Sequence, residues 1–147
     1  MDDQVIAITL YIRATAAEVW RALTDPDVTQ SYWGRTRIES DWTTGSTIRY
    51  RRDGDVVDEH VVLEVDPPRR LVHTFHPLFG EFGDEPPSRV QIDLEQAGEV
   101  TRLALRHDGF PPASKVFTAC SGGWPLILSS LKTLLETGSP LPEPAGA

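Results

Sequence analysis

The sequence predicts an α+β fold in which one antiparallel sheet packs against a long C-terminal helix. Three observations lead to this prediction. Runs of alternating apolar and polar residues joined by tight turns fill residues 36–108 and indicate strands. A helix-start signal follows the first strand-like run, and beyond residue 113 the apolar spacing changes to three and four residues, as in a helix. A curved sheet with its helices on one face leaves a concave space beneath the long helix.

The N-terminal part predicts one strand followed by two short helices. Residues 5–12 alternate loosely and favour the strand. Thr15 and Glu18 have capping-box spacing, in which each side chain accepts a hydrogen bond from a backbone N–H at a helix start. A second helix begins at Pro26, because proline suits the first helical position, and it ends at Gly34.

Six further strands and one long loop occupy the middle of the chain. The predicted strands are residues 36–42, 47–52, 56–65, 71–76, 89–96 and 100–108. The loop at residues 77–88 is longer than a hairpin requires and carries Phe79 and Phe82 among glycines and prolines. Long loops of this kind often cover binding sites, so we expect a lid, the alternative being a plain surface connection.

The C-terminal helix is expected to end at Gly138 and to kink near residues 121–123. The kink is predicted because Pro125 lacks a backbone donor and clashes with the carbonyl four residues earlier. Residues 1–138 are therefore predicted to form a single domain. Residues 139–147 contain three prolines and are predicted to be a flexible tail.

Composition narrows the classes of partner. The chain has 147 residues, a formal net charge of −8 and one cysteine. The acidic excess disfavours nucleic acid and anionic membranes, and no apolar run reaches the roughly 20 residues of a membrane span. No secretory signal is recognisable, so a cytoplasmic location is expected. Arg49, Arg51 and Arg52 are interpreted as an exposed strand edge.

Several segments together resemble a known family. They are residues 19–26 (VWRALTDP), 31–34 (SYWG), 44–46 (TGS), 62–71 (VLEVDPPRRL) and 101–110, followed by Gly123-Trp124 and by Leu128, Leu131 and Leu135. In this order and at these distances they resemble the homologues of the activator of the heat-shock-protein-90 ATPase, within the START/SRPBCC superfamily. The resemblance covers residues 5–138. One departure is Gly45-Ser46, where many relatives carry two glycines.

The resemblance implies a helix-grip fold, in which a curved seven-stranded antiparallel sheet wraps around the C-terminal helix and encloses a cavity. The superfamily uses that cavity for hydrophobic ligands such as lipids, sterols, polyketides and other aromatics, and some members are cyclases or hydratases. The chaperone-activating role belongs to larger eukaryotic members with an additional domain, which 147 residues cannot hold.

Metal binding and nucleophilic catalysis are disfavoured. His73 and His76 are three apart on a predicted strand, so they point to opposite faces. Ser129 and Lys132 match a Ser-x-x-Lys pattern, but late on a core helix and without the companion motifs. A lone Cys120 on an apolar helix is typical of a small buried hydrophobe. No dinucleotide or phosphate-loop motif is present, so we predict no metal, no cofactor and no catalytic residue.

Strand alternation directs two histidines toward the expected cavity. His73 shares a strand face with Phe75, and His107 shares one with Leu105. A few polar groups in an apolar pocket orient a ligand, the alternative being buried histidines satisfied by a carbonyl or water. We expect the following ligand-binding residues, with Phe79 and Phe82 as the lid: Trp33, Tyr50, His73, Phe75, His107, Phe117, Cys120, Trp124 and Leu128.

These observations favour a small soluble protein that encloses an apolar or aromatic molecule and does little chemistry on it. One alternative is a cyclase-like or hydrolase-like enzyme that uses His73 or His107 as general acid/base. Another is a protein-interaction module without a ligand, and a homodimer stays open in each case. The cavity discriminates among them: polar and open for an enzyme, dry and apolar for a binding protein, filled for an interaction module.

Overall fold

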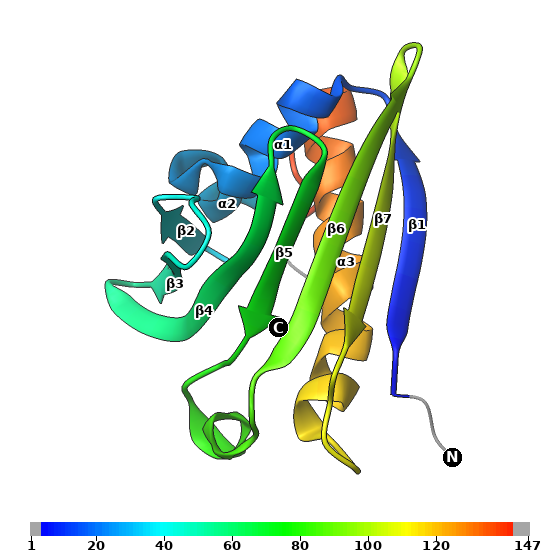
Figure 1. The fold of residues 1–147 in the computed structure, drawn as a ribbon. Coiled ribbons are helices and arrows are strands. Elements are labelled where there is room, and N and C mark those ends of the chain that lie inside the picture. The colour runs from blue at the N-terminus through cyan, green and yellow to red at the C-terminus, as the bar shows by residue number, and fades with distance from the viewer. Residues whose placement is uncertain (1–3, 143–147) are drawn as a thin grey trace.

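One seven-stranded antiparallel sheet forms the body of the protein, and a long helix crosses one of its faces (Figure 1). The computed structural model describes residues 4–142. The strand order is β1-β7-β6-β5-β4-β3-β2. The strands are β1 (Ile6–Ile12), β2 (Thr36–Ser40), β3 (Thr47–Arg52), β4 (Asp55–Asp66), β5 (Arg70–Phe75), β6 (Ser88–Ala97) and β7 (Val100–Asp108). The predicted α+β helix-grip architecture is confirmed.

Two short helices, α1 (Ala16–Thr24) and α2 (Pro26–Tyr32), follow β1, and α3 (Lys115–Thr137) is the long C-terminal helix. The predicted capping box is present, because Thr15 Oγ1 accepts from the Glu18 N–H and the Glu18 carboxylate accepts from the Thr15 N–H. Gly138 ends α3 in the left-handed conformation that glycine adopts without steric cost. None of the described helices is long and apolar enough to cross a membrane.

Most element ends lie within one or two residues of their expected positions, and β2, α3 and the long loop need separate description. β2 is two residues shorter, because the chain turns through a positive φ of 55° at Trp42. α3 continues as one helix through Pro125, and the kink expected near residues 121–123 stays a prediction. The long loop between β5 and β6 contains a 3-10 helix, η1 (Gly80–Asp84).

The segment after α3 lies partly inside the described region. Within residues 139–142, the Leu141 N–H donates to Ser130 Oγ at 3.2 Å, so this part follows the surface of α3. The remainder of the expected tail, residues 143–147, lies outside the described residues.

The core lies between α3 and the sheet face that carries alternate residues of β6 and β7. Leu103 and Leu105 on β7 are buried, as are Leu128 and Leu131 on α3. Val19 of α1 is also fully buried and belongs to the same apolar core. Full burial of one such side chain is worth roughly 1.5–3 kcal/mol, so this apolar layer holds the helix on the sheet.

Candidate functional site

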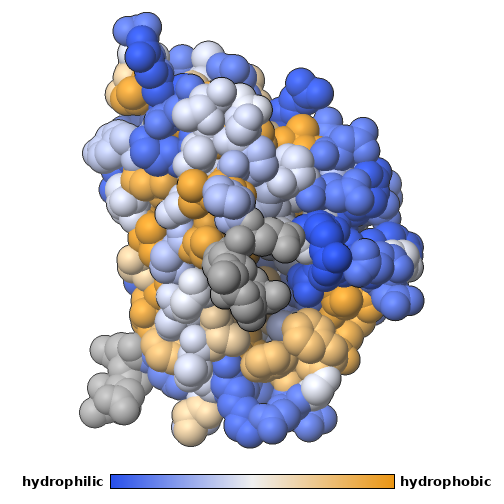
Figure 2. All heavy atoms as spheres, turned by 180° about the vertical axis from the view of Figure 1, so that it is seen from behind, coloured by the Kyte–Doolittle hydropathy of each residue, from blue (hydrophilic) through white to orange (hydrophobic). Residues whose placement is uncertain are grey.

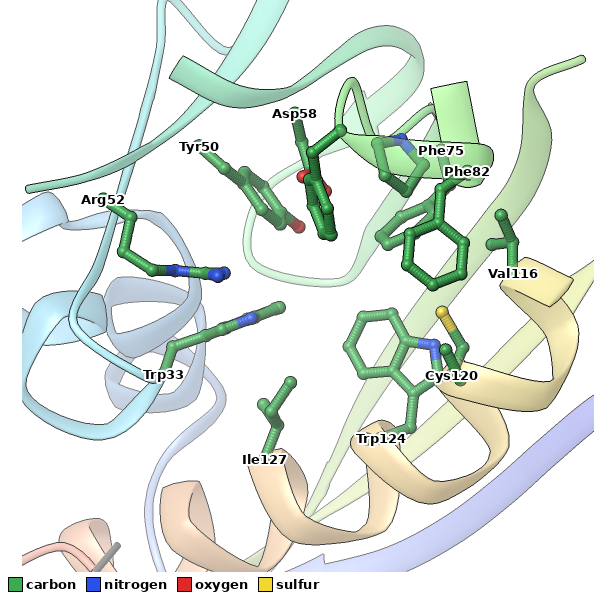
Figure 3. Close-up of a pocket in the computed structure, with 14 residues that line it drawn as sticks. Trp33, Tyr50, Arg52, Asp58, Phe75, Phe82, Val116, Cys120, Trp124 and Ile127 are labelled. Atoms are coloured by element: carbon green, nitrogen blue, oxygen red, sulfur yellow. The ribbon is translucent and has the colours of Figure 1, made fainter. Parts of the chain in front are cut away.

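A cavity of about 170 Å³ lies beneath the N-terminal half of α3 (Figure 3). Its walls come from α3, from β3, β4 and β5, from the residue that ends α2 and from the loop that contains η1. The lining residues are Trp33, Tyr50, Arg52, Asp58, Phe75, Pro77, Phe79, Phe82, Val116, Ala119, Cys120, Gly123, Trp124 and Ile127.

The cavity exists because α3 changes side-chain size along its length. Its C-terminal half places Leu128 and Leu131 against the sheet, and both are buried. Its N-terminal half presents the small Ala119, Cys120 and Gly123 at the cavity, between the larger Val116 and Trp124. Small side chains cannot reach across the distance that leucines fill, so a space remains between this half of the helix and the sheet.

Four aromatic rings define the shape of the cavity. The Trp33 ring packs edge-on against Tyr50 and Trp124, with centroid distances of 5.7 and 5.6 Å. Phe75 lies 6.5 Å from Tyr50 and 6.2 Å from Trp124. Tilted and edge-to-face contacts of this kind are favourable for aromatic pairs. The rings therefore support one another and leave a wall already shaped for an apolar or aromatic guest.

Three polar side chains interrupt this wall. Tyr50 and Asp58 are direct partners across β3 and β4, and Arg52 is two residues from Tyr50 on the same strand. All three therefore reach the cavity from one face of the sheet (Figure 3). Asp58 is only 5% exposed. Burial, together with the nearby Asp58, raises the pKa of the Tyr50 phenol well above its ordinary value, so the phenol stays protonated.

His60 lies behind the polar wall and is fully buried. Its ring stacks on Phe75 at 4.6 Å, and its Nδ1 accepts a hydrogen bond from the His76 N–H at 2.8 Å. The proton therefore sits on Nε2, which lies 3.4 Å from Asp58 Oδ2 but makes no hydrogen bond to any described group. Burial lowers the His60 pKa and Asp58 opposes this only in part, so the neutral ring is favoured.

The structure buries the two expected cavity histidines without placing either at the cavity. His73 donates from Nδ1 to the Thr74 carbonyl at 2.6 Å and lines a separate space of about 10 Å³, too small for an organic ligand. His107 accepts from Trp124 Nε1 at 3.0 Å and donates from Nε2 to Ser88 Oγ at 2.7 Å. Burial lowers the pKa of both rings to about 3. The expectation that both point into the ligand space is corrected accordingly.

The hydrogen bond from Trp124 to His107 fixes the indole that forms one cavity wall. Ser88 in turn donates to the Phe75 carbonyl at 3.4 Å, so a continuous chain joins α3, β7, β6 and β5. His107 thus serves the site indirectly, as the partner that orients Trp124.

Two other expected ligand contacts also lie away from the cavity. Leu128 is fully buried in the core layer, and Phe117 packs on Phe110 with ring centroids 5.3 Å apart. Both residues lie on α3, but their side chains do not line the cavity. Cys120 does line the cavity, and burial raises the pKa of its thiol to about 12. A thiol with so high a pKa is a weak nucleophile at neutral pH.

The two phenylalanines of the long loop lie at the cavity. Phe79 and Phe82 form an edge-to-face pair at 5.4 Å and both line it, although Phe79 remains 45% exposed. From the α3 side, hydrophobic atoms gather at the end of the molecule where this loop lies (Figure 2). Glu85 holds the loop to the start of α3, accepting from Ser114 Oγ at 2.6 Å and from the Lys115 N–H at 2.7 Å.

A second hollow of about 360 Å³ adjoins the cavity along α3. Four residues line both spaces: Trp33, Arg52, Gly123 and Ile127. Leu141 and Pro142, from the segment after α3, line its far side. Among the described residues no set of three or more His, Cys, Asp or Glu side chains is placed to hold a metal ion.

A sequence model of one family, described as Activator of Hsp90 ATPase homolog 1-like protein, matches residues 13–136. The chain belongs to this family. The resemblance drawn from the sequence is thereby confirmed. A comparison with curated protein sequences gives no significant match.

Solved structures with the same architecture include members from bacteria. CalU16 from Micromonospora echinospora is 25% identical, with a TM-score of 0.73 over 94% of this chain and 77% of its own. DynU16, from the dynemicin biosynthetic locus, is 27% identical with a TM-score of 0.77, covering 95% of this chain but only 49% of DynU16. This chain therefore spans about half the length of DynU16. The Aha1 dimer from Colwellia psychrerythraea shares the fold at 24% identity, with a TM-score of 0.73 over 91% of this chain and 97% of its own.

Three polar residues at or behind the cavity wall are not among those predicted from the sequence. Asp58 and His60 alternate with exposed neighbours in β4, and Arg52 follows Tyr50 by two positions in β3. Alternation with Val62, which is buried, would have placed the first two on the inner face. Arg52 was grouped with its neighbours as an exposed edge, although only alternate residues of a strand share a face.

Proposed function

We propose that the protein binds a small apolar or aromatic molecule in the cavity between α3 and strands β3, β4 and β5. The observation that carries the proposal is the aromatic wall of Trp33, Tyr50, Phe75 and Trp124 around a space of about 170 Å³. An apolar cavity of roughly 150 Å³ in another protein accepts benzene, so this space suits one substituted ring. Predominantly aromatic pockets with a few polar groups are typical small-molecule sites.

The loop that carries η1 is the proposed entrance. Phe79 and Phe82 line the cavity, which supports a lid role in which opening of the loop admits the ligand. Glu85 keeps the closed position by its hydrogen bonds to the start of α3. Loops that close over a bound molecule exclude water in this way.

Catalysis by a cavity histidine gains no support from the geometry. Both nitrogens of His107 have protein partners, and His73 faces a space of about 10 Å³. A general base must come within hydrogen-bond reach of its substrate, and neither ring lines the proposed site. Binding without chemistry is therefore the function that we propose.

The proposal is tested by filling the cavity from α3. A Cβ added at Gly123 meets no atom within 4 Å, and this residue lines the cavity, so the larger side chain of Gly123→Leu should occupy the ligand space. Gly122 is also free of nearby atoms but is exposed, so Gly122→Leu is the matched control. Propylbenzene is titrated into each protein while the total tryptophan fluorescence is recorded, to which Trp33 and Trp124 in the cavity wall contribute.

Wild type and Gly122→Leu should bind propylbenzene with the same affinity, and Gly123→Leu should bind at least about tenfold more weakly. Equal binding by all three proteins would place the probe elsewhere, and no binding by wild type would contradict the proposal. Native mass spectrometry of the protein purified from its own host then looks for a co-purifying small molecule.

We also propose that the chain can form a homodimer. The Colwellia relative is described as a dimer. Light scattering after size-exclusion chromatography gives 16.3 kDa for a monomer of this chain and twice that mass for a homodimer.

A further inference from the structure

Two charged side chains line the cavity without neutralising each other. Asp58 is 5% exposed, and its Oδ2 lies 3.4 Å from His60 Nε2, a contact without full hydrogen-bond geometry. Arg52 makes one hydrogen bond, from Nε to Thr36 Oγ1 at 3.2 Å, and forms no ion pair with a described carboxylate. Figure 3 shows the two side chains entering the cavity from different directions, with Tyr50 between them.

The Asp58 carboxylate lacks a partner that the protein could easily supply. His60 Nε2 is the nearby donor, but at 3.4 Å from Asp58 Oδ2 it does not reach hydrogen-bond geometry. A carboxylate removed from water is unfavourable when its lost hydration is not replaced by hydrogen bonds. A ligand donor placed at Asp58 would recover part of that cost, which makes this carboxylate a selective acceptor.

Arg52 differs from its two arginine neighbours. Arg49 pairs with Glu59 at 3.3 Å, and Arg51 pairs with Glu39 at 2.7 Å. Arg52 instead lies on the inner face and lines both the cavity and the adjoining hollow. Its terminal nitrogens are therefore available to an acceptor oxygen of a molecule that extends from one space into the other.

We propose that the ligand is dipolar: an aromatic body with a hydroxyl group that donates to Asp58 and a carboxylate or carbonyl oxygen that accepts from Arg52. This inference rests on the proposed function, because it concerns the chemistry of the molecule bound in the same cavity. A simple cation would be opposed by Arg52, and a simple anion by Asp58. A molecule with a donor at one end and an acceptor at the other satisfies both groups.

Four single-ring probes of similar size separate the two contributions. Hydroxyphenylpropionate carries both groups, propylphenol carries only the donor, phenylpropionate carries only the acceptor, and propylbenzene carries neither. Calorimetric titration of all four into the wild-type protein requires no variant, so folding defects cannot influence this part of the experiment. Hydroxyphenylpropionate should bind about tenfold or more tightly than either single-group probe, and propylbenzene should bind most weakly.

Two variants then assign each group to its partner. Asp58→Asn keeps the side-chain volume and should weaken the two phenol probes about tenfold, while phenylpropionate binds unchanged or more tightly. Arg52→Met should weaken the two carboxylate probes to a similar degree. Arg51→Met is the control for Arg52→Met, because Arg51 pairs with Glu39 outside the cavity and should leave all four affinities unchanged. Circular dichroism verifies that each variant folds.

The outcomes separate this inference from the function on which it rests. Equal affinities of all four probes for wild type, or equal effects of both variants on all probes, would overturn the dipolar ligand and leave apolar binding intact. If no probe binds wild type, both proposals fall. A crossed pattern, in which each variant weakens only the probes that carry its partner group, supports the assignment.

Discussion

The two halves of α3 face the same sheet but produce opposite results. Near its C-terminus, Leu128 and Leu131 meet β6 and β7 in a closed apolar layer. Near its N-terminus, Ala119 and Gly123 leave a cavity whose other walls are aromatic and polar. Side-chain volume on the helix is thus one difference between the closed region and the hollow one. Stability and binding are thereby assigned to different turns of one helix.

Trp124 lies where the two halves meet, and its removal should have the largest effect. The indole is buried and donates to His107 Nδ1 at 3.0 Å. Trp124→Ala should lower the free energy of unfolding by about 3–5 kcal/mol, because packing and the hydrogen bond are lost together. Urea unfolding followed by circular dichroism measures this loss. A loss of unfolding free energy below about 1 kcal/mol would contradict the buried, hydrogen-bonded position of the indole.

Stability should also fall as the pH is lowered, because the histidines around the cavity are buried in the neutral form. Burial lowers the pKa of His73 and His107 from 6.5 to about 3, so the unfolded chain takes up protons first as the pH falls. Their stabilisation is complete above about pH 6.5 and is lost progressively toward pH 3. Between pH 6.5 and 5 the loss should be roughly 1 kcal/mol per pH unit for each histidine.

The free energy of unfolding is measured by urea titration at several pH values across this range. The His107→Asn variant serves as the control. The variant is expected to be less stable at every pH but to show a shallower dependence on pH. An unchanged slope in His107→Asn, or a flat profile in wild type, would contradict the buried neutral imidazole.

The loop over the open half should depend on Glu85. Glu85→Ala removes the acceptors for Ser114 Oγ and the Lys115 N–H, and should cost about 1 kcal/mol, as for other helix caps. A probe dye such as ANS should also bind and leave faster, because the loop opens more easily. Phe79→Ala/Phe82→Ala should accelerate both rates without loss of helix. If the rates of dye binding and release, measured by stopped flow, match wild type in both variants, the loop is a surface connection and not a lid.

The smallest effect on stability is expected from a larger side chain that enters the cavity. Gly123→Leu should change the free energy of unfolding by less than about 1 kcal/mol, because a Cβ at this position meets no atom within 4 Å, the rest of the side chain enters the cavity, and glycine is a poor helix former. In the closed half, Leu131→Phe should cost about 1–3 kcal/mol through overpacking. Equal costs in urea unfolding would remove the distinction between the halves.

Most of the fold could be predicted because its determinants are local. The capping box at Thr15 and Glu18 marked the start of α1, and alternating residues marked each strand. Boundaries failed where backbone geometry intervened, as at Trp42, whose positive φ ends β2 early. Such a turn leaves little trace in a hydrophobic pattern.

The site was less predictable, because it depends on how far α3 lies from each strand. Alternation correctly buries His73 and His107, but only the three-dimensional arrangement places Trp124 between His107 and the open space. Asp58 and Arg52 could have been found by following alternation through β3 and β4. A register shift between Tyr50 and Arg51 makes such reading unsafe without the structure.

The most direct test of the central claim is to locate a bound aromatic molecule. Crystals of the protein soaked with bromobenzene allow the bromine to be found by its anomalous scattering. The account predicts a peak within the cavity, among Trp33, Phe75 and Trp124 and beneath Gly123. A Gly123→Leu crystal soaked in the same way should show no peak there. A peak only on the outer surface, or at the closed half of α3, would contradict the claim that the open half is a binding site.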